Sequence, residues 1–224
     1  MSEPRDLSRA DWRDFVAYAP AETPVDVNLG DNTSRFGVPP AALAVLQCPA
    51  STAVTRYPSA YATDLKAALA AYAGVSPDEI ATGCGSDDVL DSAFRAFARP
   101  GERFAHLSPT FPMAPRFALL NGFGVASAPL SADGAFDPSA LLAGNPAIVY
   151  LCTPNNPTGG LLDGDAVAHV VERANGVVVI DEAYAEFAGP GHLGEAPARR
   201  GLVVVRTLSK AFGLAGLRVG YACA

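Results

Sequence analysis

The chain has 224 residues, half of them hydrophobic and 17% charged, and its 16 Lys and Arg against 23 Asp and Glu give a net charge of −7. This apolar content excludes intrinsic disorder, and the negative charge argues against general nucleic-acid binding. The longest unbroken apolar run, Ala67 to Ala73, is far too short to cross a membrane, and with no charged-then-apolar leader we expect a cytoplasmic protein.

The first 27 residues are polar and interrupted by three prolines, which indicates an N-terminal arm in which Arg9 to Tyr18 has the pattern of a short helix. A regular alternation begins near Tyr61, where apolar residues at helical spacing predict a helix that ends at Gly74. Further helices are predicted over 89–97, 114–120 and 167–174, and strands over 80–83, 104–107, 124–128, 147–152, 177–180, 202–205 and 217–224.

Short strands that are apolar on both faces alternate here with amphipathic helices, which is typical of a largely parallel sheet covered on both sides. We therefore predict an α/β fold, a three-layer αβα sandwich around a mostly parallel seven-stranded sheet, with 217–224 as its last strand. Ligands of such sheets bind beyond the carboxyl ends of the strands, which is where the polar motifs of this chain fall.

The cysteines and histidines show no metal-binding pattern, because the cysteines are widely spaced and the histidines are scattered. We expect no metal site, and free thiols in a reducing cytoplasm. These residues are Cys48, Cys84, Cys152 and Cys223, and His106, His169 and His192.

Two polar clusters follow predicted strands in the first part of the domain. The first, GCGSDD over 83–88, has glycines that let the backbone approach a ligand, and Ser86 can cap a helix whose free N–H groups favour a phosphate. By itself it fits a plain strand-to-helix turn equally well. The second, TPNNPTG over 153–159, offers Asn155 and Asn156 on a loop made rigid by proline and glycine, which indicates that the loop holds something.

Two more clusters follow later strands. Asp181, in DEAY over 181–184, ends a buried strand, where a carboxylate needs a cation or several donors; the alternative is a helix cap. Lys210, in TLSKAFG over 207–213, has few charged neighbours, which predicts a lowered pKa and a Schiff base with a carbonyl; the alternative is a surface lysine with a buried stem. Two hydroxyls and Arg218 beside it form an anion site.

One ligand with an aldehyde, a phosphate and a basic ring nitrogen, such as pyridoxal phosphate, would account for all four clusters. In order and spacing they resemble the fold-type I pyridoxal-phosphate-dependent aminotransferases of class I and II, most closely the histidinol-phosphate aminotransferases. The matching stretches are RYPS (56–59), GCGSDD, SPTF (108–111), TPNNPTGG, DEAYAEF and RTLSKAFGLAGLRVG, and the likeness covers about Asn28 to Ala224.

The resemblance implies that 217–224 is the antiparallel strand of the sheet, and it implies a role for each matching residue. The catalytic residues would be Lys210, which forms the Schiff base and moves the proton, Asp181, which pairs with the pyridine nitrogen, and Tyr184, which with Asn156 hydrogen-bonds the phenolic oxygen. Phe111 would stack on the ring.

The resemblance also implies how the phosphate is bound. It would lie against Gly85 and be held by Ser86 and Asp87 through their N–H groups and by Thr207, Ser209 and Arg218. Tyr57 would reach the phosphate of the neighbouring subunit, which requires a homodimer.

The chain departs from the family pattern in several places. Phe111 stands where tyrosine is usual, Ala114 where a second aromatic residue is common, and Cys84 where asparagine is frequent. The loop that closes over substrate in the family differs here, at 30–33, so the substrate stays open.

The largest departure is the C-terminal domain, which supplies the family's substrate-binding arginine and is missing from this chain. We expect an arm over 1–27, a cofactor-binding large domain over 28–224, and a fragment of a longer protein. Arg35, Arg56 and Arg116 could contact substrate, but a solvated or structural role fits each of them better.

The resemblance predicts a transaminase that moves an amino group between an amino acid or amino-alcohol phosphate and a 2-oxo acid, as in histidine biosynthesis. A decarboxylase of the threonine-phosphate type would use the same cofactor residues, and a truncated chain could bind the cofactor without turnover. The expected partners are the amino donor, the 2-oxo acid and a second copy of the chain, with no nucleic acid and no membrane. The sequence leaves open which donor is used and whether this chain is active by itself.

Overall fold

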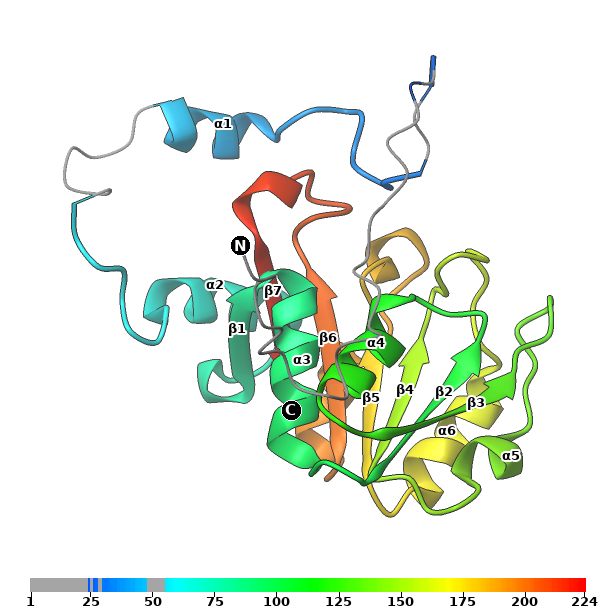
Figure 1. Ribbon diagram of the computed structural model, residues 1–224. Helices are drawn as coiled ribbons and strands as arrows, with labels where there is room; N and C mark the ends of the chain where they lie inside the picture. Colours follow the sequence, from blue (N-terminus) through cyan, green and yellow to red (C-terminus); the bar gives the residue numbers. More distant parts are fainter. Residues whose placement is uncertain (1–23, 25, 28–29, 48–54) are drawn as a thin grey trace, which may run out of the picture. The chain divides into compact units, whose positions relative to one another are not determined.

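A seven-stranded sheet in the order β1-β7-β6-β5-β4-β2-β3 organises the described part of the chain (Figure 1). All its strands run in one direction except β7, which is antiparallel to both of its neighbours, β1 and β6. The strands are β1 (Ile80–Cys84), β2 (Arg103–Ser108), β3 (Gly124–Pro129), β4 (Ile148–Cys152), β5 (Val177–Asp181), β6 (Leu202–Thr207) and β7 (Val219–Cys223). The predicted sheet, including its antiparallel last strand, is confirmed.

The computed structural model describes residues 24, 26–27, 30–47 and 55–224. The chain divides into two units, Met1–Asn32 and Thr33–Ala224, and every element named below belongs to the second. The helix expected over Arg9 to Tyr18 and the thiol of Cys48 lie outside the described residues. Of the other cysteines, all with free thiols, Cys84 is exposed and Cys152 and Cys223 are buried. No described helix is long and apolar enough to span a membrane.

Helices cover both faces of the sheet, which confirms the predicted three-layer sandwich. Apolar residues of α3 and α4 pack on one face, and those of α2, α5, α6 and η4 pack on the other. The α-helices are α1 (Pro40–Gln47), α2 (Thr63–Ala73), α3 (Gly85–Phe97), α4 (Met113–Leu120), α5 (Pro138–Leu142) and α6 (Gly164–Arg173). The 3₁₀-helices are η2 (Pro77–Glu79), η3 (Ala185–Phe187), η4 (Leu193–Ala198) and η5 (Ala215–Leu217).

The sequence predicted how two of the helices begin or end. The prediction for the end of α2 is confirmed, and the prediction for the start of α3 is not. Gly74 ends α2 in a left-handed conformation and donates its N–H to the Ala70 carbonyl, as predicted. The prediction that Ser86 caps α3 is wrong, because the helix begins at Gly85 and Ser86 lies inside its first turn. The carboxylate of Asp88 accepts the Cys84 N–H at 2.8 Å instead. The backbone N–H of Ser86 therefore lies in the open first turn of the helix.

The central strands are buried on both faces, since all residues of β4 and β6 are buried. Because both faces of these strands are buried, apolar and β-branched residues follow one another along them without alternating with polar residues. Because β4, β5 and β6 run in parallel, the polar residues that follow each of them emerge at one edge of the sheet.

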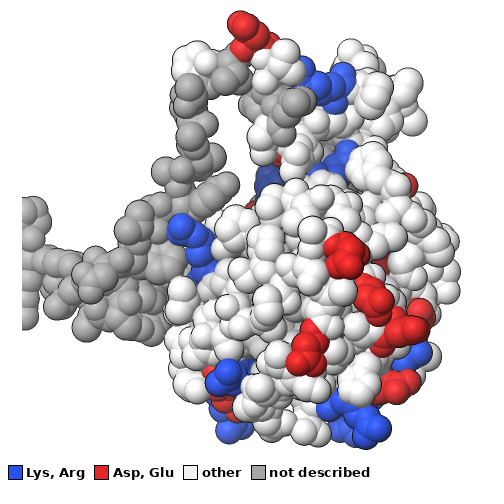
Figure 2. Space-filling view, turned by 90° about the vertical axis from the view of Figure 1, so that its right-hand side faces the viewer, with Lys and Arg blue, Asp and Glu red and all other residues white. Residues whose placement is uncertain are grey.

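On the face shown in Figure 2, basic side chains are separated by acidic and uncharged ones.

Candidate functional site

The four polar clusters meet at the carboxyl edge of the sheet. Cys152, just before the asparagine loop, pairs with Asp181, and Asp181 pairs with Val205 two residues before Thr207. On the other side Thr207 pairs with Gly220, which is two residues after Arg218 and lies against the start of α3. Residues from four separate stretches of the chain thus surround one place, as the sequence predicted.

Asp181 is a buried carboxylate, with 2% of the residue exposed. One oxygen accepts the Tyr150 hydroxyl at 2.7 Å and the other accepts the Ala183 N–H at 3.1 Å. Burial raises the pKa of Asp181 to about 6, and the two hydrogen bonds oppose that rise. Among the described residues no cation forms an ion pair with it, so the carboxylate is suited to bind a cationic group brought by a ligand.

The amino end of α3 forms a cradle together with β7. Gly85 has φ +84°, and a Cβ there would collide with the Arg218 guanidinium. A Cβ on Gly220 would likewise collide with the backbone of Gly85 and Ser86. The Arg218 guanidinium lies 3.8 Å from the Asp87 carboxylate at the same helix end. Glycine at both positions therefore lets an arginine and the helix N–H groups approach one another.

The hydroxyls of Thr207 and Ser209 adjoin this cradle. Both residues are buried, their oxygens lie 3.0 Å apart, and the Ser209 N–H donates to the Thr207 hydroxyl at 3.1 Å. The Thr207 hydroxyl also donates to the Val219 carbonyl at 3.3 Å, which ties β6 to β7 at this point. Hydroxyls, helix N–H groups and a guanidinium are the donors that bind a phosphate.

Lys210 lies in the turn that follows β6. Its residue is half-buried, and its ammonium nitrogen is 5.6 Å from the centroid of the Tyr184 ring, within cation–π distance. The Lys210 carbonyl accepts the Gly213 N–H at 3.0 Å, which closes the turn. The amine and the phenol proposed to act together are therefore neighbours.

The two adjacent asparagines have different environments. Asn155 is buried and donates to the Pro109 carbonyl at 3.2 Å and to the Thr158 hydroxyl at 3.0 Å, so it joins its own loop to the loop before α4. Asn156 is half-buried, and within the described residues its side chain makes no hydrogen bond. The structure thus leaves Asn156 as the amide available to a ligand.

Two expected cofactor residues lie nearer the surface. Phe111 is half-buried and packs against the core cluster shared by α3 and α4. Tyr57 is fully exposed, and this chain by itself does not bring it into the site.

Sequence reasoning missed two residues of the site. Tyr150 was read only as part of a buried apolar run, although a tyrosine in such a run needs a hydrogen-bond partner. Gly220 was read only as part of a strand, although glycine inside a strand often marks a close backbone approach.

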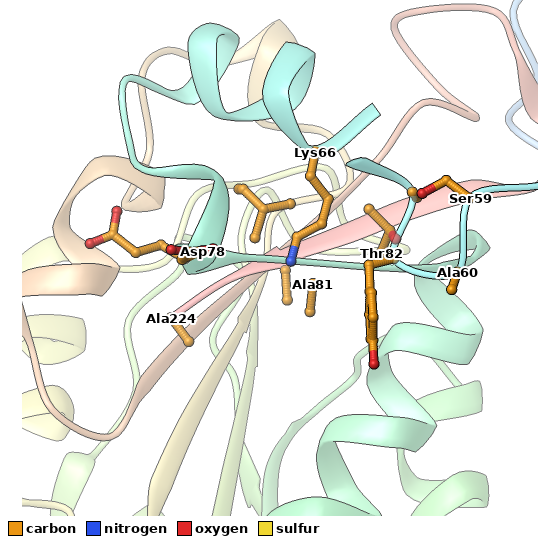
Figure 3. A pocket seen from close by; sticks show the side chains of 12 residues that line it. Ser59, Ala60, Lys66, Asp78, Ala81, Thr82 and Ala224 are labelled. Atoms are coloured by element: carbon orange, nitrogen blue, oxygen red, sulfur yellow. The ribbon is translucent and has the colours of Figure 1, made fainter. Parts of the chain in front are cut away.

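Two surface hollows lie away from this site. One, of 480 Å³, adjoins β1, and Figure 3 shows Lys66 reaching from α2 over the strand toward Ala81. The other, of 890 Å³, is lined by residues at the amino ends of β2, β4, β5 and β6, the opposite edge of the sheet. Neither includes the residues described above. Among the described residues no group of His, Cys, Asp and Glu could hold a metal ion.

The donor set fits pyridoxal phosphate. The glycine cradle with Arg218 suits its phosphate, the buried carboxylate of Asp181 suits a protonated ring nitrogen, and Lys210 is an amine for its aldehyde. The fit rests on the collision that a Cβ at Gly85 would cause, and on a buried carboxylate without a cation among the described residues.

Comparison with known proteins gives one consistent result. The family model for aminotransferase class I and II matches residues 24–224. A histidinol-phosphate aminotransferase from Thermoanaerobacter sp. strain X514 is 35% identical over 223 residues, covering 97% of this chain and 64% of the relative. The chain therefore spans less than two thirds of that relative's length.

Solved structures agree with this. The histidinol-phosphate aminotransferase from Sinorhizobium meliloti in complex with pyridoxal-5'-phosphate matches with a TM-score of 0.79 and 31% identity, covering 87% of this chain and 55% of that one. The L-threonine-O-3-phosphate decarboxylase from Porphyromonas gingivalis matches with a TM-score of 0.65 and 26% identity, covering 77% and 55%.

Proposed function

The chain belongs to the class I and II aminotransferases, and from that membership we propose that it forms the cofactor-binding part of a pyridoxal-phosphate-dependent aminotransferase resembling histidinol-phosphate aminotransferases. The observation that carries the proposal is the meeting of three groups at one edge of the sheet. These are the buried Asp181, the Arg218 cradle at Gly85 and the amine of Lys210.

Each group has a separate task in this proposal. When bound, pyridoxal phosphate supplies an aldehyde for an amine and a ring that withdraws electrons. The Asp181 carboxylate holds the proton on the ring nitrogen, and Lys210 Nζ takes and returns the proton that moves during the reaction. Arg218, Thr207, Ser209 and the first-turn N–H groups of α3 bind the phosphate.

The remaining expected residues orient the ring. The Asn156 amide and the Tyr184 hydroxyl donate to its phenolic oxygen, and Phe111 covers one face. Since Asn155 is engaged within its own loop, the asparagine that serves the ligand in this proposal is Asn156.

The substrates, partners and location belong to the same proposal. The amino donor is an amino acid or an amino-alcohol phosphate and the acceptor is a 2-oxo acid, which the names of the relatives support. Residues 28–224 form the large domain after an arm over 1–27, and a cytoplasmic homodimer places Tyr57 at the phosphate of the neighbouring subunit. The full exposure of Tyr57 supports that role. No observation favours the decarboxylase alternative.

The experiment uses the fact that the chain contains only two lysines, Lys66 and Lys210. We expect an absorbance band distinct from that of free pyridoxal phosphate when the cofactor is added to the purified protein and to the Lys66→Ala variant, and no such band for Lys210→Ala. Borohydride reduction followed by peptide mass spectrometry should place the cofactor on Lys210. A label on Lys66, or a band that survives in Lys210→Ala, contradicts the proposal.

The reaction is tested with the same samples. Adding candidate amino donors and 2-oxoglutarate should form a new amino acid and a 2-oxo product in the parent. Release of carbon dioxide without a 2-oxo product would identify a decarboxylase, and cofactor binding without turnover would identify an inactive fragment.

A further inference from the structure

Tyr150 is a buried tyrosine that lies behind the site and has no task in the proposed function. It lies in β4 with no exposed surface, and its ring contacts the rings of Phe94 and Phe104, each with a centroid 6.3 Å away. These two rings leave the hydroxyl pointing at Asp181, whose Oδ2 it reaches at 2.7 Å. A side chain held in this way has a defined acceptor and a defined orientation.

The strand register explains why the two residues meet. Cys152 is opposite Asp181, and Tyr150 is opposite Val179, so Tyr150 and Asp181 are diagonal neighbours on the same face of the sheet. With the Ala183 N–H on the other oxygen, both oxygens of Asp181 have a donor, which sets the plane of the carboxylate.

We propose that Tyr150 is a positioning residue, whose hydroxyl fixes the Asp181 carboxylate and holds it as an anion for the cationic ring nitrogen. The identity of that cationic group rests on the proposed function. The link between Tyr150 and Asp181 does not, because both residues and their hydrogen bond belong to this chain.

The charges around Asp181 show why such a donor matters. Burial raises the pKa of Asp181, and the nearby acidic groups Asp87 on α3 and Glu182, the residue after β5, raise it further. Tyr150 and the Ala183 N–H lower it. The pKa of Tyr150 itself is raised well above its ordinary value by burial and by Asp181, so the phenol keeps its proton and donates it. The buried thiol of Cys152 also faces the pair, and burial raises its pKa so that it stays uncharged.

Tyr221 provides a matched control. It also lies in the sheet with no exposed surface, but it faces the opposite side, and its hydroxyl has no hydrogen-bond partner among the described residues. Tyr221→Phe therefore removes the same atom as Tyr150→Phe from a buried strand position without breaking a bond to Asp181.

The test measures the Asp181 carboxyl directly in protein without cofactor. Aspartate labelled with ¹³C at Cγ is titrated by NMR, with the Asp181 signal assigned through Asp181→Asn. We expect Tyr150→Phe to raise the pKa of Asp181 by about one pH unit, because a hydrogen bond to the charged form is lost. Tyr221→Phe should match the parent, and thermal unfolding checks that both variants fold. An unchanged pKa in a folded Tyr150→Phe overturns the proposal.

A second arm uses bound cofactor and separates the two proposals. The pH midpoint of pyridoxal phosphate affinity should move upward in Tyr150→Phe by the same amount as the NMR titration, and should not move in Tyr221→Phe. If the NMR pKa rises but the affinity midpoint stays, Tyr150 does not act on the cofactor and the proposal fails. If the parent binds no cofactor while the NMR pKa rises, the link to Asp181 stands and the proposed function fails.

Discussion

Gly85 and Gly220 show at the scale of single residues how the phosphate cradle is made. Each brings backbone next to a group that a Cβ would displace, the Arg218 guanidinium in one case and the start of α3 in the other. Gly85 also has a positive φ, which residues with a Cβ adopt at a cost. A larger residue would therefore collide with its neighbours at either position, and at Gly85 it would also have to adopt an unfavourable backbone conformation.

Replacing Gly85 with alanine should damage cofactor binding more than stability. The new methyl would push the Arg218 guanidinium away from the helix end, and we expect pyridoxal phosphate affinity to fall about tenfold or more, equivalent to the loss of one good charged hydrogen bond. Fluorescence or absorbance titration measures this.

Gly74→Ala is the matched control for that substitution. Gly74 also has a positive φ, +73°, but a Cβ there meets nothing within 4 Å. The Gly74→Ala substitution should lower the free energy of unfolding by about 1 kcal/mol and leave cofactor affinity unchanged. Equal affinities for Gly85→Ala and the parent would show that Arg218 does not need the glycine.

At the scale of elements, consecutive residues at the carboxyl ends of β5 and β6 point to opposite faces of the sheet. Asp181 and Thr207 face the site, whereas their neighbours Glu182 and Arg206 point to the opposite face and are both buried. Glu182 accepts two hydrogen bonds from Arg206, at 2.9 and 2.8 Å, and one of its oxygens lies 3.0 Å from the His192 ring. This ion pair joins the two strands directly behind the site.

Removing Glu182 should strongly destabilise the fold. Glu182→Ala leaves the Arg206 guanidinium buried without its main partner, and we expect a loss of about 3–5 kcal/mol in the free energy of unfolding, measured with urea. Glu195→Ala is the control. It breaks an exposed ion pair with Arg199 and should change stability by less than about 1 kcal/mol. Similar losses in both variants would contradict this account.

The same variant should change how stability depends on pH. The hydrogen bond to Glu182 raises the pKa of His192 above its ordinary value. The stability that protonated His192 contributes is therefore fully present below the unfolded pKa of histidine. It is lost as pH rises through the pKa of His192 in the folded protein. In Glu182→Ala this loss of stability with rising pH should be smaller.

At the scale of the whole molecule, large apolar side chains before α2 are exposed. Phe36, Val45, Tyr57 and Tyr61 are largely or fully exposed, and none of the residues of α1 is buried. Exposed apolar side chains that recur along one segment of the chain favour an interface. They support the homodimer of the proposed function.

We expect this surface to control assembly. The protein should sediment as a dimer at micromolar concentration, and Phe36→Ser combined with Val45→Ser should raise the dimer dissociation constant about tenfold or more, as expected for two lost apolar contacts. Leu161→Ser, an exposed leucine elsewhere, is the control and should sediment like the parent. A monomeric parent would contradict the expectation.

Much of the fold was predictable because its signals are local. The β-branched runs before Cys152, Asp181 and Thr207 each predicted a buried strand, and the parallel direction of those strands placed the motifs at one edge. The capping role of Ser86 was not predictable, because it depended on whether the helix begins at Gly85 or two residues later. Such a difference arises from packing against β7 rather than from local preference.

By itself, the sequence determined the strand order in the chain and the clusters that hold Lys210 and Asp181, because periodicity and short motifs are local properties. Only the tertiary structure decided that Asn155 is engaged while Asn156 is available, and that Tyr150 donates to Asp181. Those choices depend on which residues of distant strands become neighbours, and that register follows from packing across the whole sheet.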